Sequence, residues 1–361
     1  MSDPLPDRPQ KGRGAVSNAA SGRFTALDRE RSDDGWNTAE ADLDERTDTV
    51  VGTDASRTIV TRNQSPDVPF DRSINPYKGC EHGCIYCFAR PTHAYLDLSP
   101  GLDFETRIFA KPDAAGLLRR ELNKGGYVPE VVTLGANTDP YQPVERRLEI
   151  TREILKVLAE ARHPVCIVTK SATVTRDIDI LSDMGRRNLA RVMLSVTTLD
   201  RDLARKLEPR AATPARRLDA IRQLSTAGVA TGVLVAPVIP AINDPEVEAI
   251  LAEAARAGAA SAGYVLLRLP HEIKDLFAEW LDTHYPDRKD RVLSLVRQNR
   301  DGALNDAAWG RRLKGTGAHA ELLARRFDLA CRKNGVNGNR WDLDTSLFRK
   351  PERDGRQGAL F

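Results

Sequence analysis

The stretch of the chain that decides its fold and chemistry is Cys80-Glu81-His82-Gly83-Cys84-Ile85-Tyr86-Cys87-Phe88-Ala89-Arg90. We call residues 80–90 the cysteine loop. Its cysteines have C-x3-C-x2-C spacing, so three thiolates lie on one short segment. Three such thiolates can hold three corners of a [4Fe–4S] cube, and the fourth iron then has no protein ligand and can bind another molecule. The loop therefore predicts an iron–sulfur site with Cys80, Cys84 and Cys87 as metal ligands.

Two other interpretations of these cysteines have to be weighed. Zinc accepts sets of three cysteines and one histidine, so Cys80, His82, Cys84 and Cys87 are an alternative set of zinc ligands. Structural zinc sites usually take their ligands from two separate knuckles, whereas these four lie within eight residues. Disulfides fit poorly, because cysteines are few and three in one loop cannot all pair. A zinc-stabilised nucleic-acid-binding module without catalysis stays open as the alternative.

The composition bounds the class of protein and its compartment. The chain has 361 residues, 41% of them hydrophobic, and a net charge of +3, which is too small to imply a partner by itself. Its first residues are polar and rich in proline, unlike a signal peptide. No apolar run approaches the roughly 20 residues that a membrane helix needs. Free cysteines favour a reducing compartment, so we expect a cytoplasmic protein.

Short apolar or β-branched runs alternate with amphipathic stretches from about residue 58 onward. We expect strands at 72–78, 130–134, 165–169, 192–197, 229–236 and 264–269. We expect helices at 113–123, 144–161, 176–187, 214–227, 244–257 and 271–281. Strands that alternate with helices form a parallel sheet, and six such units predict an α/β fold with an open, partial (β/α)6 barrel. Ligands of such sheets bind at the carboxyl ends of the strands, where the cysteine loop also lies.

The segments on either side of the predicted barrel, residues 58–285, differ from it in composition. Residues 1–57 contain few large apolar side chains, so we expect a disordered tail. Residues 286–348 are helical in pattern and basic. They include a glycine-rich stretch, residues 309–317, that is either a phosphate-binding loop or a solvated basic face. Residues 349–361 are expected to form a flexible C-terminal tail.

The sequence resembles the radical S-adenosylmethionine (SAM) superfamily, in the group related to spore photoproduct lyase that is often described as DNA-repair-photolyase-like. The resemblance rests on the cysteine spacing, with Tyr86 before the third cysteine, and on five further segments. These are N-P-Y-K-G before Cys80, N-T-D-P-Y-Q-P-V-E from Asn137, T-K-S from Thr169, L-E-P-R from Leu207 and P-V-I-P-A-I-N-D from Pro237. The resemblance implies a partial barrel that holds a [4Fe–4S] cluster and SAM. In this superfamily SAM binds the open iron, and one electron splits it into methionine and a 5′-deoxyadenosyl radical that abstracts a substrate hydrogen.

The resemblance also implies which residues bind the cofactor. SAM carries an ammonium, a carboxylate and a sulfonium, so its site needs both hydrogen-bond acceptors and donors. The expected SAM-binding residues are Tyr86, Asn137, Thr138, Asp139, Lys170, Ser195 and Arg210. N-T-D-P is also typical of a turn, which is the alternative for residues 137–139. Glu208 and Arg210 can instead pair with each other. The sequence assigns no catalytic residue.

The partners implied by the resemblance are an electron donor, such as a flavodoxin or ferredoxin, and a nucleic-acid substrate; a peptide or small molecule is the alternative substrate. Spore photoproduct lyases use a separate cysteine after the second strand to return a hydrogen atom, and this chain has none between Cys87 and Cys166. That departure counts against thymine-dimer-type repair. Cys166 lies in an apolar strand pattern and Cys331 in a helical, basic segment, and both are expected to pack. Tyr77 and Tyr141 are candidates for radical relays.

The chain ends Gln357-Gly358-Ala359-Leu360-Phe361. This end resembles the short Q-x-x-L-F peptide by which bacterial DNA-repair and replication proteins bind the sliding clamp. Leu360 and Phe361 would fill an apolar pocket, as short anchors on a disordered tail do. The second position is usually leucine and is Gly358 here. The alternative is a tail without a partner.

Overall fold

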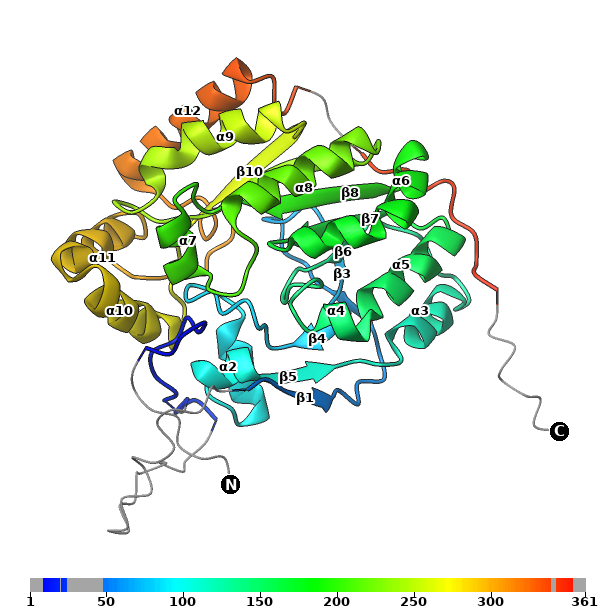
Figure 1. Cartoon of the computed structure of the whole chain (residues 1–361), viewed down its shortest axis with the longest axis horizontal. Coiled ribbons are helices and arrows are strands. Elements are labelled where there is room, and N and C mark those ends of the chain that lie inside the picture. The colour runs from blue at the N-terminus through cyan, green and yellow to red at the C-terminus, as the bar shows by residue number, and fades with distance from the viewer. Residues whose placement is uncertain (1–8, 20, 25–47, 339–341, 353–361) are drawn as a thin grey trace, which may run out of the picture.

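A seven-stranded sheet is the centre of the fold in the computed structural model of the chain (Figure 1). The structure describes residues 9–19, 21–24, 48–338 and 342–352, so the expected clamp peptide lies outside the described residues. The strand order is β10-β9-β8-β7-β6-β3-β2, in which β3 to β10 run parallel and β2 is antiparallel at the edge. The parallel strands confirm the expected partial barrel. The strands are β2 (Val60–Arg62), β3 (Arg72–Ile74), β6 (Val132–Leu134), β7 (Val165–Thr169), β8 (Ala190–Ser195), β9 (Ala230–Val238) and β10 (Ser261–Leu266).

Helices connect the parallel strands and lie in front of the sheet in Figure 1. They are α3 (Ala114–Leu122), α4 (Glu145–Leu148), α5 (Ile150–Glu160), α6 (Ile178–Arg186), α7 (Arg201–Leu207), α8 (Pro214–Thr226) and α9 (Val247–Arg256). The single helix expected at 144–161 is divided, because Glu149 takes a left-handed conformation with φ of 50° between α4 and α5. The main core lies between these helices and the sheet; Ile154 and Leu158 of α5, for example, are fully buried. No described helix is long and apolar enough to cross a membrane.

A second, three-stranded sheet lies beside the first and was not expected from the sequence. It has the order β1 (Val50–Thr53), β5 (Arg107–Ala110), β4 (Tyr77–Lys78). The strand expected at 72–78 is divided at Asn75-Pro76, since proline has no N–H to continue a ladder. Its first half is β3 of the main sheet and its second half is β4. Between β4 and β5 the chain forms the cysteine loop, a 3₁₀ helix η2 (Arg90–Leu96) and α2 (Leu102–Thr106).

The N-terminal segment departs from the expected disordered tail. Residues 9–19 and 21–24 pack on the folded domain. The carboxylate of Glu105 accepts hydrogen bonds of 2.9 Å from the backbone N–H groups of Gly14 and Ala15, and Ala15 is only 1% exposed. A segment with few apolar side chains is therefore ordered here by hydrogen bonds to a buried carboxylate rather than by a core of its own.

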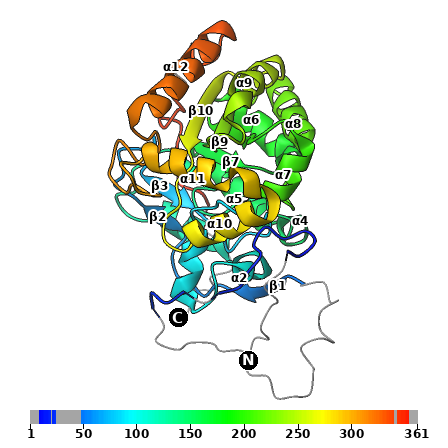
Figure 2. The ribbon, with the colours of Figure 1, turned by 90° about the vertical axis from the view of Figure 1, so that its left-hand side faces the viewer.

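The basic C-terminal extension is helical, as expected. After α10 (Ile273–His284) and the 3₁₀ turn η5 (Pro286–Arg288) follow α11 (Lys289–Gln298) and α12 (Gly317–Lys333), and α12 lies against α9 (Figure 2). The cations of the glycine-rich stretch are used within the protein. Arg311 pairs with Asp301, Arg312 pairs with Asp67 at 2.5 Å, and Lys314 Nζ lies 3.4 Å from the centroid of the Tyr264 ring. These contacts count against a phosphate-binding role for residues 309–317.

Candidate functional site

The cysteine loop is fixed by the buried side chains of its last residue, Arg90, and of Glu105 in α2. The guanidinium of Arg90 donates to the carbonyl oxygen of Cys84 at 2.8 Å and pairs with Glu105 at 2.5 Å, and both charged side chains are fully buried. Gly83 has φ of +67°, and a Cβ at this position would lie 2.7 Å from Glu105 Oε2. Only glycine fits a left-handed position so close to another side chain. Arg90 and Glu105, which the sequence did not single out, thus set the course of the loop.

The three thiols of the loop lie close enough together to influence one another's ionisation. Burial raises the pKa of Cys80 well above the usual value, and the charges of Asp139 and of the other two cysteines raise it further. Burial, and next the charge of Glu208, raise the pKa of Cys84 to about 12. Without a metal, the thiols of Cys80 and Cys84 are therefore neutral near pH 7. A metal group that takes all three as thiolates must displace their protons.

The described side chains around the cysteine loop do not form a ready site for a single metal ion. A Zn–S bond of about 2.3 Å brings the sulfurs of one zinc site within about 4 Å of each other. Among the residues that the structure describes, no three His, Cys, Asp or Glu side chains converge in that way. A [4Fe–4S] cube spreads three cysteines over three irons and holds their sulfurs further apart. His82, which the zinc alternative needs, places its Nδ1 3.3 Å from Asp139 Oδ2.

Asp139 is bonded to the protein through both carboxylate oxygens. Oδ1 accepts from the Tyr141 N–H at 2.8 Å and the Thr169 hydroxyl at 2.7 Å, and Oδ2 accepts from the Lys170 N–H at 2.7 Å and faces His82. Burial alone would raise the pKa of Asp139, but His82 and these hydrogen bonds outweigh it and lower the pKa to about 2. Asp139 therefore ties the loop after β6 to the end of β7 and to the cysteine loop. This placement favours the turn alternative for Asp139.

Other side chains of the segment after β6 either stabilise the fold or remain available to a ligand. The Thr138 hydroxyl donates to the Tyr77 carbonyl at 2.8 Å, so its side chain fixes β4. The fully buried Gln142 bridges the start of the cysteine loop, because it donates to the Gly79 carbonyl and accepts from the Glu81 N–H. The Asn137 side chain makes no hydrogen bond to any other described residue. Of residues 137–139, Asn137 is the one whose polar side chain is left for a ligand.

A buried polar cluster joins the cysteine loop to the strand ends of β7 and β8. The Tyr86 hydroxyl donates to Glu208, which also accepts from the Thr197 hydroxyl at 2.6 Å and pairs with Arg217. Lys170 Nζ lies 5.7 Å from the centroid of the Tyr86 ring. Burial alone would raise the pKa of Glu208, but the charges of Arg217 and Lys170 lower it to about 2. Glu208 is thus an ionised, buried counter-charge at the edge of the site.

Ser195 and Arg210 lie on different sides of that cluster. Ser195 ends β8, is 3% exposed, and its carbonyl accepts from the Arg217 guanidinium at 2.9 Å. Arg210 pairs with Glu81 at 3.0 Å. The alternative in which Glu208 and Arg210 pair with each other is therefore wrong. Arg217, nine residues after Glu208, was missed, because its spacing from L-E-P-R carries no sequence signal.

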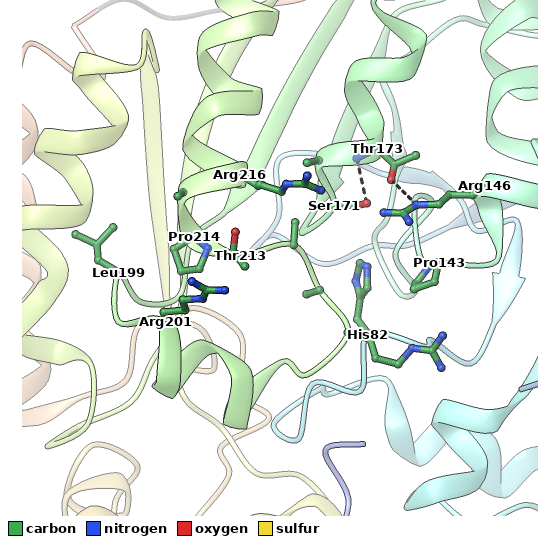
Figure 3. A pocket seen from close by; sticks show the side chains of 15 residues that line it. His82, Pro143, Arg146, Ser171, Thr173, Leu199, Arg201, Thr213, Pro214 and Arg216 are labelled. Carbon is green, nitrogen blue, oxygen red and sulfur yellow. Dashed lines mark hydrogen bonds between the residues drawn. The ribbon is translucent and has the colours of Figure 1, made fainter. Parts of the chain in front are cut away.

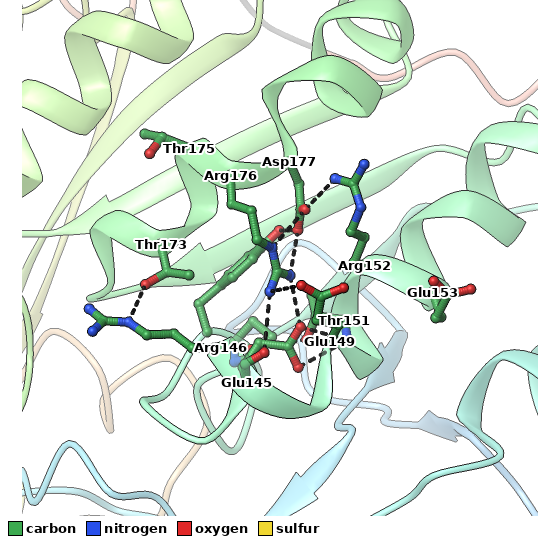
Figure 4. A network of polar contacts seen from close by, with 12 residues as sticks. Glu145, Arg146, Glu149, Thr151, Arg152, Glu153, Thr173, Thr175, Arg176 and Asp177 are labelled. Carbon is green, nitrogen blue, oxygen red and sulfur yellow. Dashed lines mark hydrogen bonds and ion pairs between the residues drawn. The ribbon is translucent and has the colours of Figure 1, made fainter.

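Tyr77 and Tyr141 hydrogen-bond to a network of charged side chains around Arg176. Figure 4 shows Arg176 with the two carboxylates of that network, Glu145 and Asp177. Tyr77 donates to Glu145 and Tyr141 donates to Asp177 at 3.0 Å. Arg176 binds Glu145 at 2.9 Å and Asp177 at 3.0 Å. Burial, and next the neighbouring carboxylates, raise the pKa of both phenols well above the usual value. Both tyrosines therefore stay protonated and hydrogen-bonded, and their contacts support a structural role.

Comparisons with known proteins establish the family. A model of the radical SAM superfamily matches residues 74–254, half of the chain, so the chain belongs to the radical SAM superfamily. An uncharacterized protein of Mycobacterium tuberculosis strain H37Rv is 36% identical over 233 residues, which are 64% of this chain and 68% of the relative. An uncharacterized protein of Methanocaldococcus jannaschii is 27% identical over 173 residues, 48% of this chain and 62% of that protein.

Solved structures of spore photoproduct lyase variants share the fold. One aligns with a TM-score of 0.57 at 18% identity and covers 80% of each chain. Another, which contains AdoMet and a dinucleoside spore photoproduct, aligns with a TM-score of 0.56 at 18% identity and the same coverage. At this identity the likeness shows the fold alone. The family itself implies that the chain is an enzyme that uses SAM and an iron–sulfur cluster.

Proposed function

We propose that the chain holds a [4Fe–4S] cluster on Cys80, Cys84 and Cys87 and binds SAM beside it, at the carboxyl ends of β6, β7 and β8. The observation that carries the proposal is that three mutually close thiols share one loop whose neighbouring side chains, Tyr86 and Lys170, meet at those strand ends. When bound and reduced, such a cluster supplies the electron for reductive cleavage of SAM to a 5′-deoxyadenosyl radical, which abstracts a hydrogen from the substrate.

The roles of the chain's own residues follow from their contacts. Asn137 offers an amide oxygen to the SAM ammonium, since its side chain is not used by the fold. Lys170 offers its ammonium to the SAM carboxylate. It lies near enough to Cys84 for its charge to oppose, in part, the rise in the pKa of that thiol. Tyr86 is held in place by Glu208 and forms a fixed wall of the site. Ser195, at the end of β8, offers a hydroxyl to the ribose.

The substrate class that we propose is nucleic acid. A spore photoproduct lyase variant of the same fold was solved with a dinucleoside, which supports this class for the present chain. The hydrogen-return chemistry must differ, because no cysteine lies between Cys87 and Cys166. Cys166 lies within β7, and burial raises its pKa to about 11, as expected for a packing residue.

The test is anaerobic reconstitution with iron and sulfide, followed by dithionite and SAM. We expect about four irons and four sulfides per chain and formation of 5′-deoxyadenosine. The matched control is the variant Cys80→Ala, Cys84→Ala, Cys87→Ala, which should keep its fold by circular dichroism and lose the iron. Zinc in place of iron in the wild type, or an iron-loaded triple variant, would contradict the proposal.

A further inference from the structure

A cationic pocket of about 480 Å³ opens beside the cysteine loop (Figure 3). It lies between α4, the residues 171–173 that follow β7, α7 and the first turn of α8. Its wall includes His82 of the cysteine loop, and the arginines Arg146, Arg201, Arg210 and Arg216 surround it. Among the described residues that line it, none is an aspartate or a glutamate. The pocket is therefore a concentration of positive charge without carboxylates in its wall.

Three of these arginines form no close ion pair with a carboxylate of the described residues. Arg146 donates only a long hydrogen bond of 3.4 Å to the Thr173 hydroxyl. Arg201 and Arg216 form no ion pair with a described residue, and all three side chains are exposed. Arg210 differs, because it pairs with Glu81. Some other exposed arginines of this chain, such as Arg186, Arg256 and Arg325, do pair with a neighbouring carboxylate. Clustered cations without partners point to an acidic ligand outside the chain.

The pocket adjoins the part of the site proposed for SAM, because Ser171, which follows Lys170, and Arg210 both line it. His82 lies between Cys80 and Cys84, and its carbonyl accepts from the Arg210 N–H at 3.3 Å, so the cysteine loop contributes to the pocket wall through His82. Asn137, Lys170 and Ser195 do not line it. A partner seated there comes next to the cluster ligands while SAM occupies the strand ends.

We infer that this pocket is the docking surface of the electron donor, an electron-transfer protein with an acidic surface around a one-electron cofactor. The inference rests on the proposed function, which requires one electron to leave the reduced donor and enter the cluster. Electron-transfer encounters use small, weak interfaces, so four arginines around one depression are enough to orient the partner. Their main effect is on the rate of encounter, because complementary charge raises association rates by about 10- to 1,000-fold at low salt.

The experiment measures cluster reduction by anaerobic stopped flow, with reduced flavodoxin and, separately, reduced ferredoxin as probes. The test variant is Arg146→Glu, Arg201→Glu, Arg216→Glu. The matched control is Arg186→Glu, Arg256→Glu, Arg325→Glu, which makes the same change of charge on the exposed faces of α6, α9 and α12. A neutral variant, Arg146→Gln, Arg201→Gln, Arg216→Gln, gives an intermediate change of charge. Each protein is also reduced with dithionite, which needs no docking surface.

At low salt we expect the test variant to be reduced by its protein donor at least about ten-fold more slowly than the wild type. The neutral variant should fall between them, and the control should stay within about two-fold of the wild type. The differences should shrink at high salt, where exposed charges are screened. Dithionite-driven formation of 5′-deoxyadenosine should be the same in all four proteins.

Equal rates in the test and control variants would overturn the docking surface. So would a wild type that dithionite reduces and neither protein donor does, although the proposed function would then stand. Unchanged reduction together with weakened binding of a single-stranded oligonucleotide would assign the pocket to nucleic acid instead. No 5′-deoxyadenosine with dithionite in the wild type would refute the proposed function, and the docking surface with it.

Discussion

Replacement of Glu208 by glutamine tests the buried contact that joins the segment between α7 and α8 to the cysteine loop. Glu208 is 2% exposed and Arg217 is 1% exposed, and the two form an ion pair. Glutamine keeps the shape of the side chain and removes its charge, which leaves the Arg217 guanidinium buried without a counter-charge. Removal of one partner of a buried ion pair costs about 3–5 kcal/mol, so we expect a loss of that order in the free energy of unfolding.

The pKa of Glu208 gives a second route to the same magnitude. It falls from an ordinary value of 4.5 to about 2 in the folded protein. At 1.36 kcal/mol per pKa unit, this difference corresponds to about 3 kcal/mol of stability. Because the folded pKa lies below the unfolded one, the contribution is complete above pH 4.5 and is lost as the pH falls towards 2. Glu208→Gln removes this part of the pH dependence.

The assay is urea denaturation of the cluster-free protein under reducing conditions, at pH values from 7 down to about 3. The variant should be about 3 kcal/mol less stable at pH 7, and the difference should narrow as the pH falls below 4.5. Glu253→Gln is the control, since its carboxylate pairs with Arg256 on the exposed face of α9 and should contribute less than about 1 kcal/mol. A loss below about 1 kcal/mol for Glu208→Gln, or a difference independent of pH, would refute the reasoning.

Three further changes test single residues or segments. Asp139→Ala should lower the free energy of unfolding by about 2 kcal/mol or more, because the Thr169 hydroxyl and the Lys170 N–H lose their hydrogen-bond acceptor. If the folded variant binds SAM with unchanged affinity in equilibrium dialysis, the role of Asp139 is limited to shaping the turn. Cys166→Ala should keep both 5′-deoxyadenosine formation and substrate turnover, and loss of turnover alone would make Cys166 a hydrogen donor. A peptide of the last dozen residues should bind bacterial sliding clamp with affinity that Leu360→Ala and Phe361→Ala abolish, and equal binding by the doubly substituted peptide would remove the clamp hypothesis.

The sequence predicts the elements whose pattern is local. The strand expected at 165–169 is β7 with the same bounds, and the helix expected at 214–227 is α8 within one residue, because an apolar run and a Thr-Pro start are visible in the chain itself. The second sheet is not local. β1 pairs with β5, more than fifty residues later, and its sequence, Val50-Val51-Gly52-Thr53, is too short a run to predict a strand by itself. Pairing of that kind leaves no periodicity in either partner.

The same difference between local patterns and distant contacts decides which site residues the sequence could predict. The sequence predicts Tyr86, Lys170 and Ser195 at one face, because parallel strands end on one edge. In the structure Lys170 Nζ lies 5.7 Å from the centroid of the Tyr86 ring, and Ser195 is the last residue of β8. The sequence does not show which polar side chains the fold itself uses. The sequence predicts Thr138 and Asp139 as SAM-binding residues. In the structure the Thr138 hydroxyl bonds to β4, and the Asp139 carboxylate bonds to the end of β7 and contacts His82. Hydrogen-bond partners distant in sequence decide that assignment.

The order of the cysteine loop depends on residues outside the part that the family shares. Arg90 holds the Cys84 carbonyl, and Glu105 neutralises Arg90. Glu105 in turn accepts from the N–H groups of Gly14 and Ala15, far before the matched residues 74–254. A buried carboxylate needs all of its acceptor positions filled, so an N-terminal segment without a core of its own completes the support of the metal-binding loop. The segment that composition alone predicts to be a tail is therefore part of the structure that positions the thiols.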